Sequence, residues 1–369
     1  MRFQRVAIEA VGFTLPSEIV SSLDLEVALE PAYERLRLPV GRLELMSGIA
    51  ERRFWPRHTP IGVPSVNSAR LALDAAGISP QDIGCLVHAS VCRDYLEPAT
   101  ACRVHADLGL NASCWVHDLS NACLGLLSGM VQIATMIEMG IIRAGLVVGT
   151  ESARNLVEST VVSLNADQNL TRQSIKPSFA SLTIGSGSCA ILLTDIDFSR
   201  TGNRLLACVA RAECEHHALC QSDTDQAGAA MQPLMQTNSE DLLHAGVAVG
   251  CRTFEQLIAE GLEPSVLDST VCHQVGVAHR KLMLSSLGLE THRDFSTFHW
   301  LGNTGAVALP TALALGIASE AIVGGHTTAL LGIGSGINSI MMHTAWEKPI
   351  AVGELDANAR RNLTNRKET

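Results

Sequence analysis

The chain has 369 residues, enough to bury a large core and more than a single domain of usual size contains. Hydrophobic residues make up 47% and charged residues 17%, which excludes a disordered protein and favours an α/β fold with a sheet covered on both faces. The formal net charge of -10 opposes an extended nucleic-acid surface, so an anionic ligand would need a local basic patch.

The cysteines and the termini indicate a reduced, cytoplasmic protein. There are 11 cysteines, an odd number without the spacing of a disulfide framework, so free thiols are expected. The N-terminus lacks the apolar core of a signal peptide. The longest apolar stretch, 124–142, contains Gln132 and Glu138, which favours a buried helix over a membrane span.

The first half alternates between strand and helix patterns, and residues 155–178 read as a long irregular excursion that covers a site. The elements expected from these patterns are strands over 3–11, 48–55, 83–91, a buried strand over 114–116, and 145–150, with helices over 23–36, 65–76, 99–108 and 124–142.

The second half repeats features of the first. The glycine turn and apolar run at 182–193 are echoed at 331–342, and the segment 300–310 opens an apolar helix as the turn at Cys123 does. This indicates an internal duplication. We therefore expect two related halves, 1–200 and 201–346, followed by a polar tail, 347–369, that frays.

Two other kinds of site are disfavoured. Cys214, His216, His217 and Cys220 match no structural zinc spacing, so no metal site is predicted. The glycine turns lack the G-x-G-x-x-G spacing before a helix, which argues against a nicotinamide dehydrogenase.

Cys123 stands at the turn between a predicted strand and an apolar helix. The free amides and positive dipole of the first helical turn can stabilise a thiolate and hold an oxyanion, as a nucleophile requires. The alternative is an ordinary buried cysteine. Two later stretches favour the nucleophile: His273, at the end of a predicted strand, and Asn303, in a turn that opens a helix, are polar groups able to bind a thioester oxygen as charge develops.

Glu97 lies just before Pro98, in a polar interruption between a strand and the helix 99–108. From position alone it is a helix cap, a surface residue or a functional carboxylate. Arg42, Arg52 and Arg53 belong to the densest basic cluster of the chain, which is either solvated surface or a seat for a ligand's phosphates.

Over roughly residues 1–345 the sequence resembles the ketoacyl-ACP synthase III branch of the thiolase-fold condensing enzymes. The resemblance rests on the segments 48–53 and 118–123, on His273-Gln274 and on Gly302-Asn303-Thr304. It implies an α/β, duplicated five-layer αβαβα fold and a homodimer. By motif, Cys123 would be the acylated nucleophile, and His273 with Asn303 would activate the second substrate.

Within that branch the segments 93–98 and 332–336 are most similar to the OleA-type enzymes of olefin biosynthesis. This implies an acyltransferase that joins two fatty acyl-CoAs by Claisen condensation without decarboxylation. An ordinary acyl-CoA must lose an α-proton, and the resemblance assigns this step to Glu97, reaching across the dimer interface.

Coenzyme A thioesters would be substrates, and no cofactor is expected. Arg42, Arg52 and Arg53 are candidates for the CoA phosphates, although Arg42 and Met46 stand where synthases III carry the tryptophan and arginine that grip the adenine. Downstream lipid enzymes or an acyl carrier protein are possible partners. The alternative function is a decarboxylating 3-oxoacyl-ACP synthase III that uses acyl-CoA and malonyl-ACP.

Overall fold

The fold is organised by one long mixed sheet that divides into two parts. The computed structural model describes residues 1–222 and 234–365. Within these residues the sheet has ten strands in the order β11-β12-β13-β8-β1-β7-β6-β4-β5, with β14 also pairing with β1. The two parts meet between β8 and β1, which pair at Ala7 and Arg204, and the segment before β1 adds a bridge between Arg2 and Ala207. The division expected at residue 200 falls between β7 and β8.

The strands match most of the expected positions. Those of the first part are β1 (Val6–Thr14), β4 (Cys85–Ala89), β5 (Trp115–Leu119), β6 (Ala144–Glu151) and β7 (Gly187–Asp195), and those of the second are β8 (Arg204–Ala212), β11 (Ser269–Cys272), β12 (Thr327–Gly334) and β13 (Asn338–Ala345). Two short pairs, β2 (Glu18–Ser21) with β3 (Glu51–Phe54) and β9 (Cys220–Ser222) with β10 (Met235–Thr237), lie outside the large sheet.

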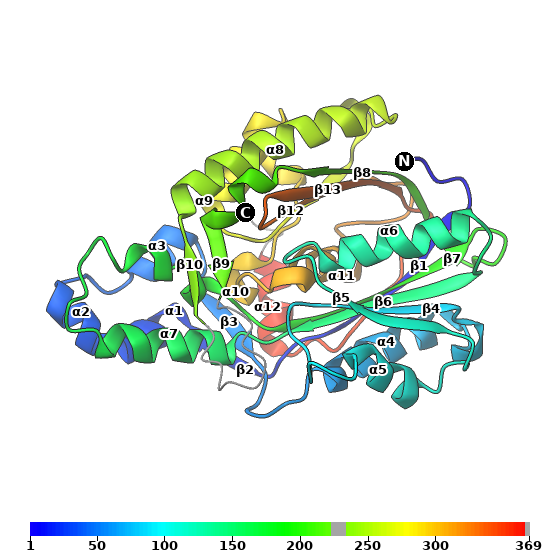
Figure 1. Ribbon diagram of the computed structural model, residues 1–369. Helices are drawn as coiled ribbons and strands as arrows, with labels where there is room; N and C mark the ends of the chain where they lie inside the picture. Colours follow the sequence, from blue (N-terminus) through cyan, green and yellow to red (C-terminus); the bar gives the residue numbers. More distant parts are fainter. Residues whose placement is uncertain (223–233, 366–369) are drawn as a thin grey trace.

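Helices cover both faces of each part and give five layers (Figure 1). Helices α4 (Gly62–Ala76) and α5 (Thr100–Leu108) cover one face of the first part, and α6 (Gly125–Glu138) and α11 (Ala308–Ala318) lie in the middle. Helix α8 (Ser239–Ala259) covers the outer face of the second part, with α9 (Val277–Ser286) packed against it. The expected αβαβα arrangement is confirmed.

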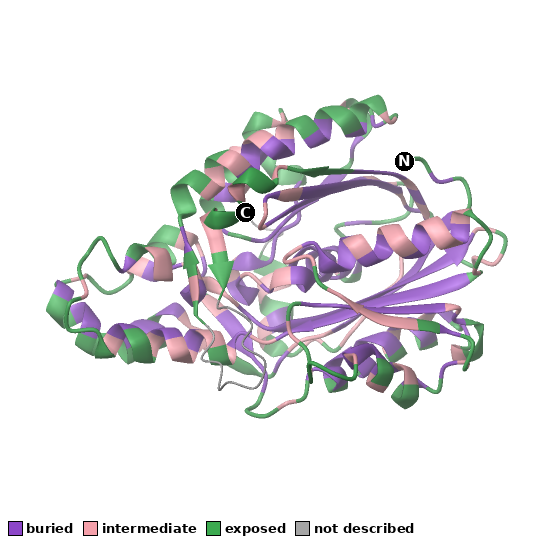
Figure 2. Cartoon of the chain, in the orientation of Figure 1, coloured by how far each residue is buried: buried purple, intermediate pink, exposed green. Residues whose placement is uncertain are grey.

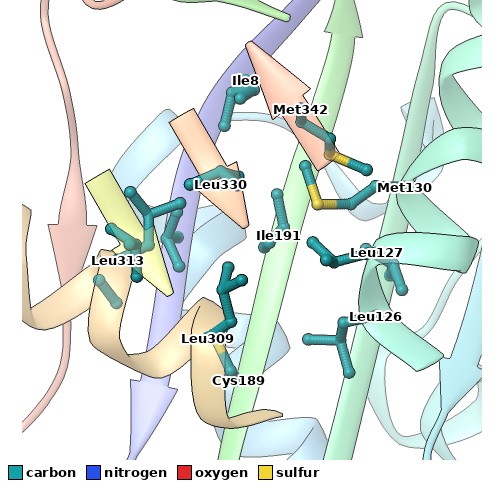
Figure 3. Close-up of a cluster of buried hydrophobic side chains, with 14 of the residues drawn as sticks. Ile8, Leu126, Leu127, Met130, Cys189, Ile191, Leu309, Leu313, Leu330 and Met342 are labelled. Atoms are coloured by element: carbon teal, nitrogen blue, oxygen red, sulfur yellow. The ribbon is translucent and has the colours of Figure 1, made fainter. Parts of the chain in front are cut away.

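The middle helices join the two parts through a shared core. Its largest cluster takes side chains from α6, α11 and the inner faces of strands in both parts, and Figure 3 shows them interdigitated. Its labelled members are Ile8, Leu126, Leu127, Met130, Cys189, Ile191, Leu309, Leu313, Leu330 and Met342. Burial of this apolar surface is the main favourable term in folding.

The two glycine turns of the predicted duplication occupy corresponding places. The first leads into β7, antiparallel to β6, and the second leads into β13, antiparallel to β12. Strands β12 and β13 form a hairpin, whereas β6 and β7 are neighbours joined by a long connection that contains α7.

Several expectations about local structure were wrong. Residues 155–178 are not irregular throughout, since α7 (Arg154–Ala166) occupies their first half and buries Val157, Thr160 and Leu164 at helical spacing. The helix expected over 23–36 is two helices, α1 (Ser22–Ala28) and α2 (Glu30–Leu36), because Pro31 suits the first turn of a new helix and not the middle of one.

The polar tail is anchored and does not fray over its described length. Strand β14 (Ala351–Val352) pairs with β1, and helix α12 (Ala357–Asn365) follows. The Asp356 carboxylate accepts two hydrogen bonds from the buried Arg53 guanidinium, at 2.6 and 2.9 Å. A buried cation needs such a partner, so this ion pair ties the tail to the body of the protein.

Strand β5 is not the buried strand that the sequence suggested. It is the last strand of the sheet, its Trp115 side chain is 64% exposed, and its other residues are only partly buried, as Figure 2 shows. An edge strand of this kind leaves one row of backbone groups unpaired. Among the described helices, none is long and apolar enough to cross a membrane.

A substitution at Gly332 of β12 tests how closely the two parts of the fold pack against each other. A methyl group at this position would lie 2.6 Å from Leu127 Cδ1, 2.7 Å from the Ile340 carbonyl oxygen and 2.8 Å from Leu124 Cδ2. We expect Gly332→Ala to lower the free energy of unfolding by about 1–3 kcal/mol, through overpacking. Gly246→Ala in α8 is the control, since its methyl group meets only Ile333 at 3.5 Å and should be neutral or stabilising in thermal denaturation. Equal melting temperatures for the two variants would contradict the tight contact.

Candidate active site

Cys123 lies in the turn between β5 and α6, as expected. The preceding residue, Ala122, has a φ of 43°, in the left-handed region that costs a non-glycine residue about 1–2 kcal/mol. The Asn121 side chain holds the turn by donating to Ser128 Oγ at 2.9 Å and accepting from Asn338 Nδ2 at 3.1 Å. Asn121 therefore connects the Cys123 turn to both α6 and β13, a role that its place in the motif did not reveal.

The resting Cys123 side chain is a thiol, contrary to the expectation of a stabilised thiolate. Burial, with smaller contributions from Cys220 and Glu151, raises the pKa of Cys123 to about 12. The backbone amides of Cys123 and Ser335 oppose this rise but do not cancel it. Attack by Cys123 on an electrophile therefore requires that its proton be transferred in the same step.

His273 follows directly on β11, as the sequence indicated. Its backbone N–H donates to the Leu331 carbonyl at 3.0 Å, and the side chain is only 3% exposed. Burial, with the neighbouring His279, lowers the pKa of His273 to about 3. The imidazole is thus neutral near pH 7 and can act as a hydrogen-bond donor without carrying a charge.

Asn303 lies in a turn that is hydrogen-bonded to the segment before β7. Its backbone N–H donates to the Thr183 carbonyl at 3.0 Å, and its carbonyl accepts from Gly185 N–H at 2.9 Å. The side-chain Oδ1 accepts from Gly305 N–H at 3.1 Å, which leaves the Nδ2 amide as the donor of this side chain.

Gln274 connects the His273 segment with the turn that carries Asn303. Its side-chain nitrogen donates to the Cys272 carbonyl at 2.5 Å, and its oxygen accepts from the backbone N–H groups of Thr297 and Phe298. Phe298 begins the short helix α10 (Phe298–Leu301) that leads to Asn303. Gln274 thus bridges the segment that carries His273 and the turn that carries Asn303.

The Cys123, His273 and Asn303 turns converge at one end of the middle layer. At the end of β12, a methyl group on Gly334 would lie 3.0 Å from Leu124 Cγ and 3.6 Å from the Cys123 backbone nitrogen. Strand β12 also pairs in parallel with β11, which His273 follows. Near Asn303, the Ala306 methyl group lies 3.3 Å from where a methyl group on Gly125, at the start of α6, would stand. This places a thiol, a neutral imidazole and an amide around one region.

No hydrogen bond or ion pair among the described residues joins Glu97 to this group. Glu97 is exposed, in the loop between β4 and α5. It is not the cap of α5, because the helix N-cap is Ala99 and the first N–H groups of the helix, those of Thr100 and Ala101, donate to Asp118 at 2.8 Å. The capping interpretation is therefore wrong, and a functional role for Glu97 stays a prediction.

Glu151 is a buried carboxylate beside the site that the sequence reasoning did not select. It ends β6, and its Oε atoms accept hydrogen bonds from the backbone N–H groups of Val91 at 2.9 Å and Cys92 at 3.3 Å. Burial raises its pKa, against the opposing effect of these donors. The sequence signal that could have identified Glu151 was its position directly after an apolar segment predicted to be a buried strand.

Arg52 and Arg53 are not available to a ligand's phosphates, and this part of the sequence interpretation is wrong. Their side chains are 0% and 1% exposed. Arg52 donates to Ser22 Oγ and the Leu182 carbonyl, and Arg53 binds Asp356. Both guanidinium groups fulfil structural roles because a buried cation requires such partners.

Arg42 does line a cavity. The cavity measures about 400 Å³ and lies between the turn after α2 and the loop after α7. Its lining residues are Arg37, Leu38, Pro39, Arg42, Arg172, Gln173 and Lys176. Four of them are cationic, and within the described ranges none of the four forms an ion pair with a carboxylate. In a protein of net charge -10, such a group favours an anionic ligand.

One group of metal-type ligands occurs elsewhere. Among the described residues, atoms of Glu213, Glu215 and His216 lie within 4.8 Å of one another, and His216 belongs to the Cys/His segment for which no metal site was predicted. The Glu213 carboxylate is already bound by Arg211 and Arg252, whose positive charges oppose a metal ion.

Comparison with known proteins identifies the family. Residues 257–346 match the family described as 3-oxoacyl-[acyl-carrier-protein] synthase III C terminal. The fold matches the structure of Xanthomonas campestris OleA with a TM-score of 0.87 at 31% identity, covering 94% of this chain and 98% of that one. A structure named 3-oxoacyl-(acyl carrier protein) synthase III, FabH, from Xanthomonas oryzae also matches, with a TM-score of 0.87 at 32% identity, covering 94% and 100% of the two chains.

Solved structures of the Xanthomonas campestris OleA include variants in which one cysteine, one glutamate or one histidine is replaced, and one variant with bound lauric acid and lauroyl-CoA. This chain is 39% identical to an acyl-CoA:acyl-CoA alkyltransferase of Shewanella oneidensis over 351 residues, which cover 94% of this chain and 100% of that protein. The chain therefore belongs to the OleA-type acyl-CoA:acyl-CoA alkyltransferase family of thiolase-fold enzymes.

Proposed function

We propose that the protein condenses two fatty acyl-CoAs to a β-ketoacyl product through an acyl-Cys123 intermediate, without decarboxylation. The observation that carries the proposal is the convergence of Cys123, neutral His273 and Asn303 in a chain 39% identical to an acyl-CoA:acyl-CoA alkyltransferase.

In the first half-reaction the Cys123 sulfur attacks the thioester carbonyl of one acyl-CoA. The carbon–sulfur bond to CoA breaks, and the departing CoA thiolate takes up the proton that Cys123 loses. The raised pKa of Cys123 fits this order, because the thiol keeps its proton until a substrate is bound. Backbone amides at the start of α6 are suited to hold the developing oxyanion.

In the second half-reaction another acyl-CoA must become a carbon nucleophile. A carboxylate removes its α-proton, and His273 and the Asn303 amide donate hydrogen bonds to the enolate oxygen. The α-carbon then attacks the acyl-Cys123 carbonyl, the new carbon–carbon bond forms, and the Cys123 thiolate leaves and recovers a proton from the base. A neutral imidazole suits this role, since it stabilises the enolate without first surrendering its own proton.

We assign the proton-abstracting role to Glu97 of the partner subunit in a homodimer. Glu97 is exposed in the loop that follows β4, and the neighbouring edge strand β5, whose Leu119 end pairs with the end of β4 from which this loop leaves, offers unpaired backbone. Pairing of two β5 strands would cover this edge and carry each loop toward the other site.

The sequence separation between two substituted residues in a related enzyme supports this assignment. In the Xanthomonas campestris OleA the substituted glutamate and cysteine lie 26 positions apart, and Glu97 and Cys123 are separated by the same 26 positions. The equality is specific to these two residues, because the replaced histidine lies at a different distance from the cysteine in the two chains.

The cationic cavity at Arg42 is proposed as the seat of the CoA phosphates, in place of Arg52 and Arg53. Its four uncompensated cations suit the several negative charges at the nucleotide end of CoA. Arg42 begins helix α3 (Arg42–Ser47). The C-terminal end of this helix lies toward the active site, since the Ser47 carbonyl approaches Gly276, three residues after His273.

We further propose that the enzyme works in the cytoplasm, where acyl-CoA or an acyl carrier protein and downstream lipid enzymes would be its partners.

Glu97→Gln separates this function from the decarboxylating alternative. The substitution keeps the size of the side chain but removes the base, so formation of acyl-Cys123 and release of the first CoA should persist. Condensation of two acyl-CoAs should fall by about 10²–10⁴-fold. Intact-protein mass spectrometry and quantified product measure the two steps. A malonyl donor needs no α-proton abstraction, so full condensation with malonyl-ACP, and none between two acyl-CoAs in the wild type, would establish the alternative.

Lys176→Glu tests the phosphate seat. It removes one attraction and adds one repulsion at an exposed position, each worth up to about 1 kcal/mol, so KM for a long-chain acyl-CoA should rise roughly tenfold. The corresponding acyl-pantetheine, which has no nucleotide phosphates, should be unaffected. Lys281→Glu, on the exposed surface of α9, is the matched charge control. The proposed phosphate-binding site would be wrong if both lysine variants alter KM for acyl-CoA equally, or if the KM for acyl-pantetheine rises as much as that for acyl-CoA.

A further inference from the structure

The loop over residues 91–99, here called the Glu97 loop, is fixed at its ends and middle by carboxylates. Asp118 accepts the Thr100 and Ala101 N–H groups just after the loop. In the middle, Asp94 accepts the N–H groups of Ile61 and Gly62 at 2.5 and 3.1 Å, at the start of α4. Between these fixed points, residues 95–98 are exposed.

Glu151 holds the beginning of the same loop. Its two carboxylate oxygens accept the N–H groups of Val91 and Cys92, the first two residues of the loop. Glu151 is 6% exposed, and no cation neutralises it among the described residues within ion-pair distance. A buried carboxylate is costly unless hydrogen-bonded, so its retention here calls for a role.

Glu151 also borders its own chain's active site. A methyl group built on Gly305, two residues after Asn303, would lie 3.2 Å from Glu151 Cγ. The hydrogen bonds of the carboxylate go to the Glu97 loop, whereas it meets the Asn303 turn through packing and influences Cys123 through its charge.

We propose that Glu151 is a positioning residue that sets the Glu97 loop, so that its chain's Glu97 reaches the acyl-CoA bound in the partner subunit. This inference rests on the proposed function, because it assumes that Glu97 acts across the dimer. The Glu151 carboxylate offers a separate acceptor oxygen to each of the two N–H groups. In Glu151→Gln the amide NH₂ would face one of the two donors, and the start of the loop would lose a fixed point.

The Glu151→Gln homodimer should therefore acylate Cys123 normally but condense poorly. Misplacing a catalytic group by about 1 Å costs about 10²-fold, and we expect a loss of roughly 10- to 100-fold in condensation, smaller than that of Glu97→Gln. Equal losses in acylation and condensation would indicate general damage and overturn the proposal. Glu151→Asp, which retains the charge but withdraws it by one methylene, provides a second variant with the same expectation.

Mixed dimers identify the site that Glu151 serves. Two differently tagged chains are co-expressed and the heterodimer is purified through both tags. In Glu151→Gln with Cys123→Ala, the surviving nucleophile lies on the Glu151→Gln chain, and its base comes from the other chain, whose Glu151 is intact. Condensation should recover to about half that of the wild type, one site of two.

The opposite pairing, Glu151→Gln with Glu97→Gln, should not recover. One nucleophile then faces the amide that replaces the base, and the other receives a Glu97 whose loop lacks Glu151. If condensation recovers in this mixed dimer and not in the mixed dimer of Glu151→Gln with Cys123→Ala, Glu151 acts within the active site of its own chain and the proposal is overturned.

The pairing of Cys123→Ala with Glu97→Gln is the control for the proposed function. Recovery to about half establishes the shared site, and failure of the first pairing then counts against Glu151 alone. Absence of recovery in the control would overturn the shared site and, with it, this inference.

Discussion

The close contact between α6 and β12 is the constraint on which the active site depends. Helix α6 belongs to the first half of the chain and β12 to the second, and Gly332 lets Leu124 and Leu127 approach β12 where any side chain would collide. Leu124 directly follows Cys123, and β12 pairs with the strand that His273 follows. The packing that joins the two halves is therefore also what brings the nucleophile near the imidazole, because close-packed cores fix positions to within a fraction of a methyl group.

Burial then sets the chemistry of the assembled groups. It keeps Cys123 a thiol, keeps His273 neutral and raises the pKa of Glu151. An uncharged thiol and an uncharged imidazole suit two apolar acyl chains, and they delay charge separation until a thioester is bound. The charged functions proposed for the enzyme lie toward the surface, with the cations around the Arg42 cavity and with the exposed Glu97.

Much of the fold followed from the sequence. The position of Cys123 between a strand and a helix and the placement of His273 after a strand were predicted, because apolar periodicity is a local signal, whereas the five layers were implied by the family resemblance. The family resemblance was confirmed by the comparisons. Helix α7 was missed because its buried stripe of Val157, Thr160 and Leu164 is set among polar residues, and its partners lie far along the chain.

The errors at the site share a cause, since burial and long-range pairing cannot be read from adjacent residues. Arg52 and Arg53 looked like a surface cluster, yet both are enclosed, and the partner of Arg53, Asp356, lies 303 positions away. The first N–H groups of α5 donate to Asp118, which a neighbouring strand supplies, and not to the adjacent Glu97. Glu151 was overlooked because its importance comes from the loop it holds.

The most direct test of the account uses a single long-chain acyl-CoA, deuterated at its α-carbon, with no malonyl donor present. The account predicts a condensed β-keto product that contains two complete acyl chains and forms without release of carbon dioxide. The α-carbon that forms the new bond should have lost a deuterium during turnover. Acylation of Cys123 with no condensed product until malonyl-ACP is added would contradict it.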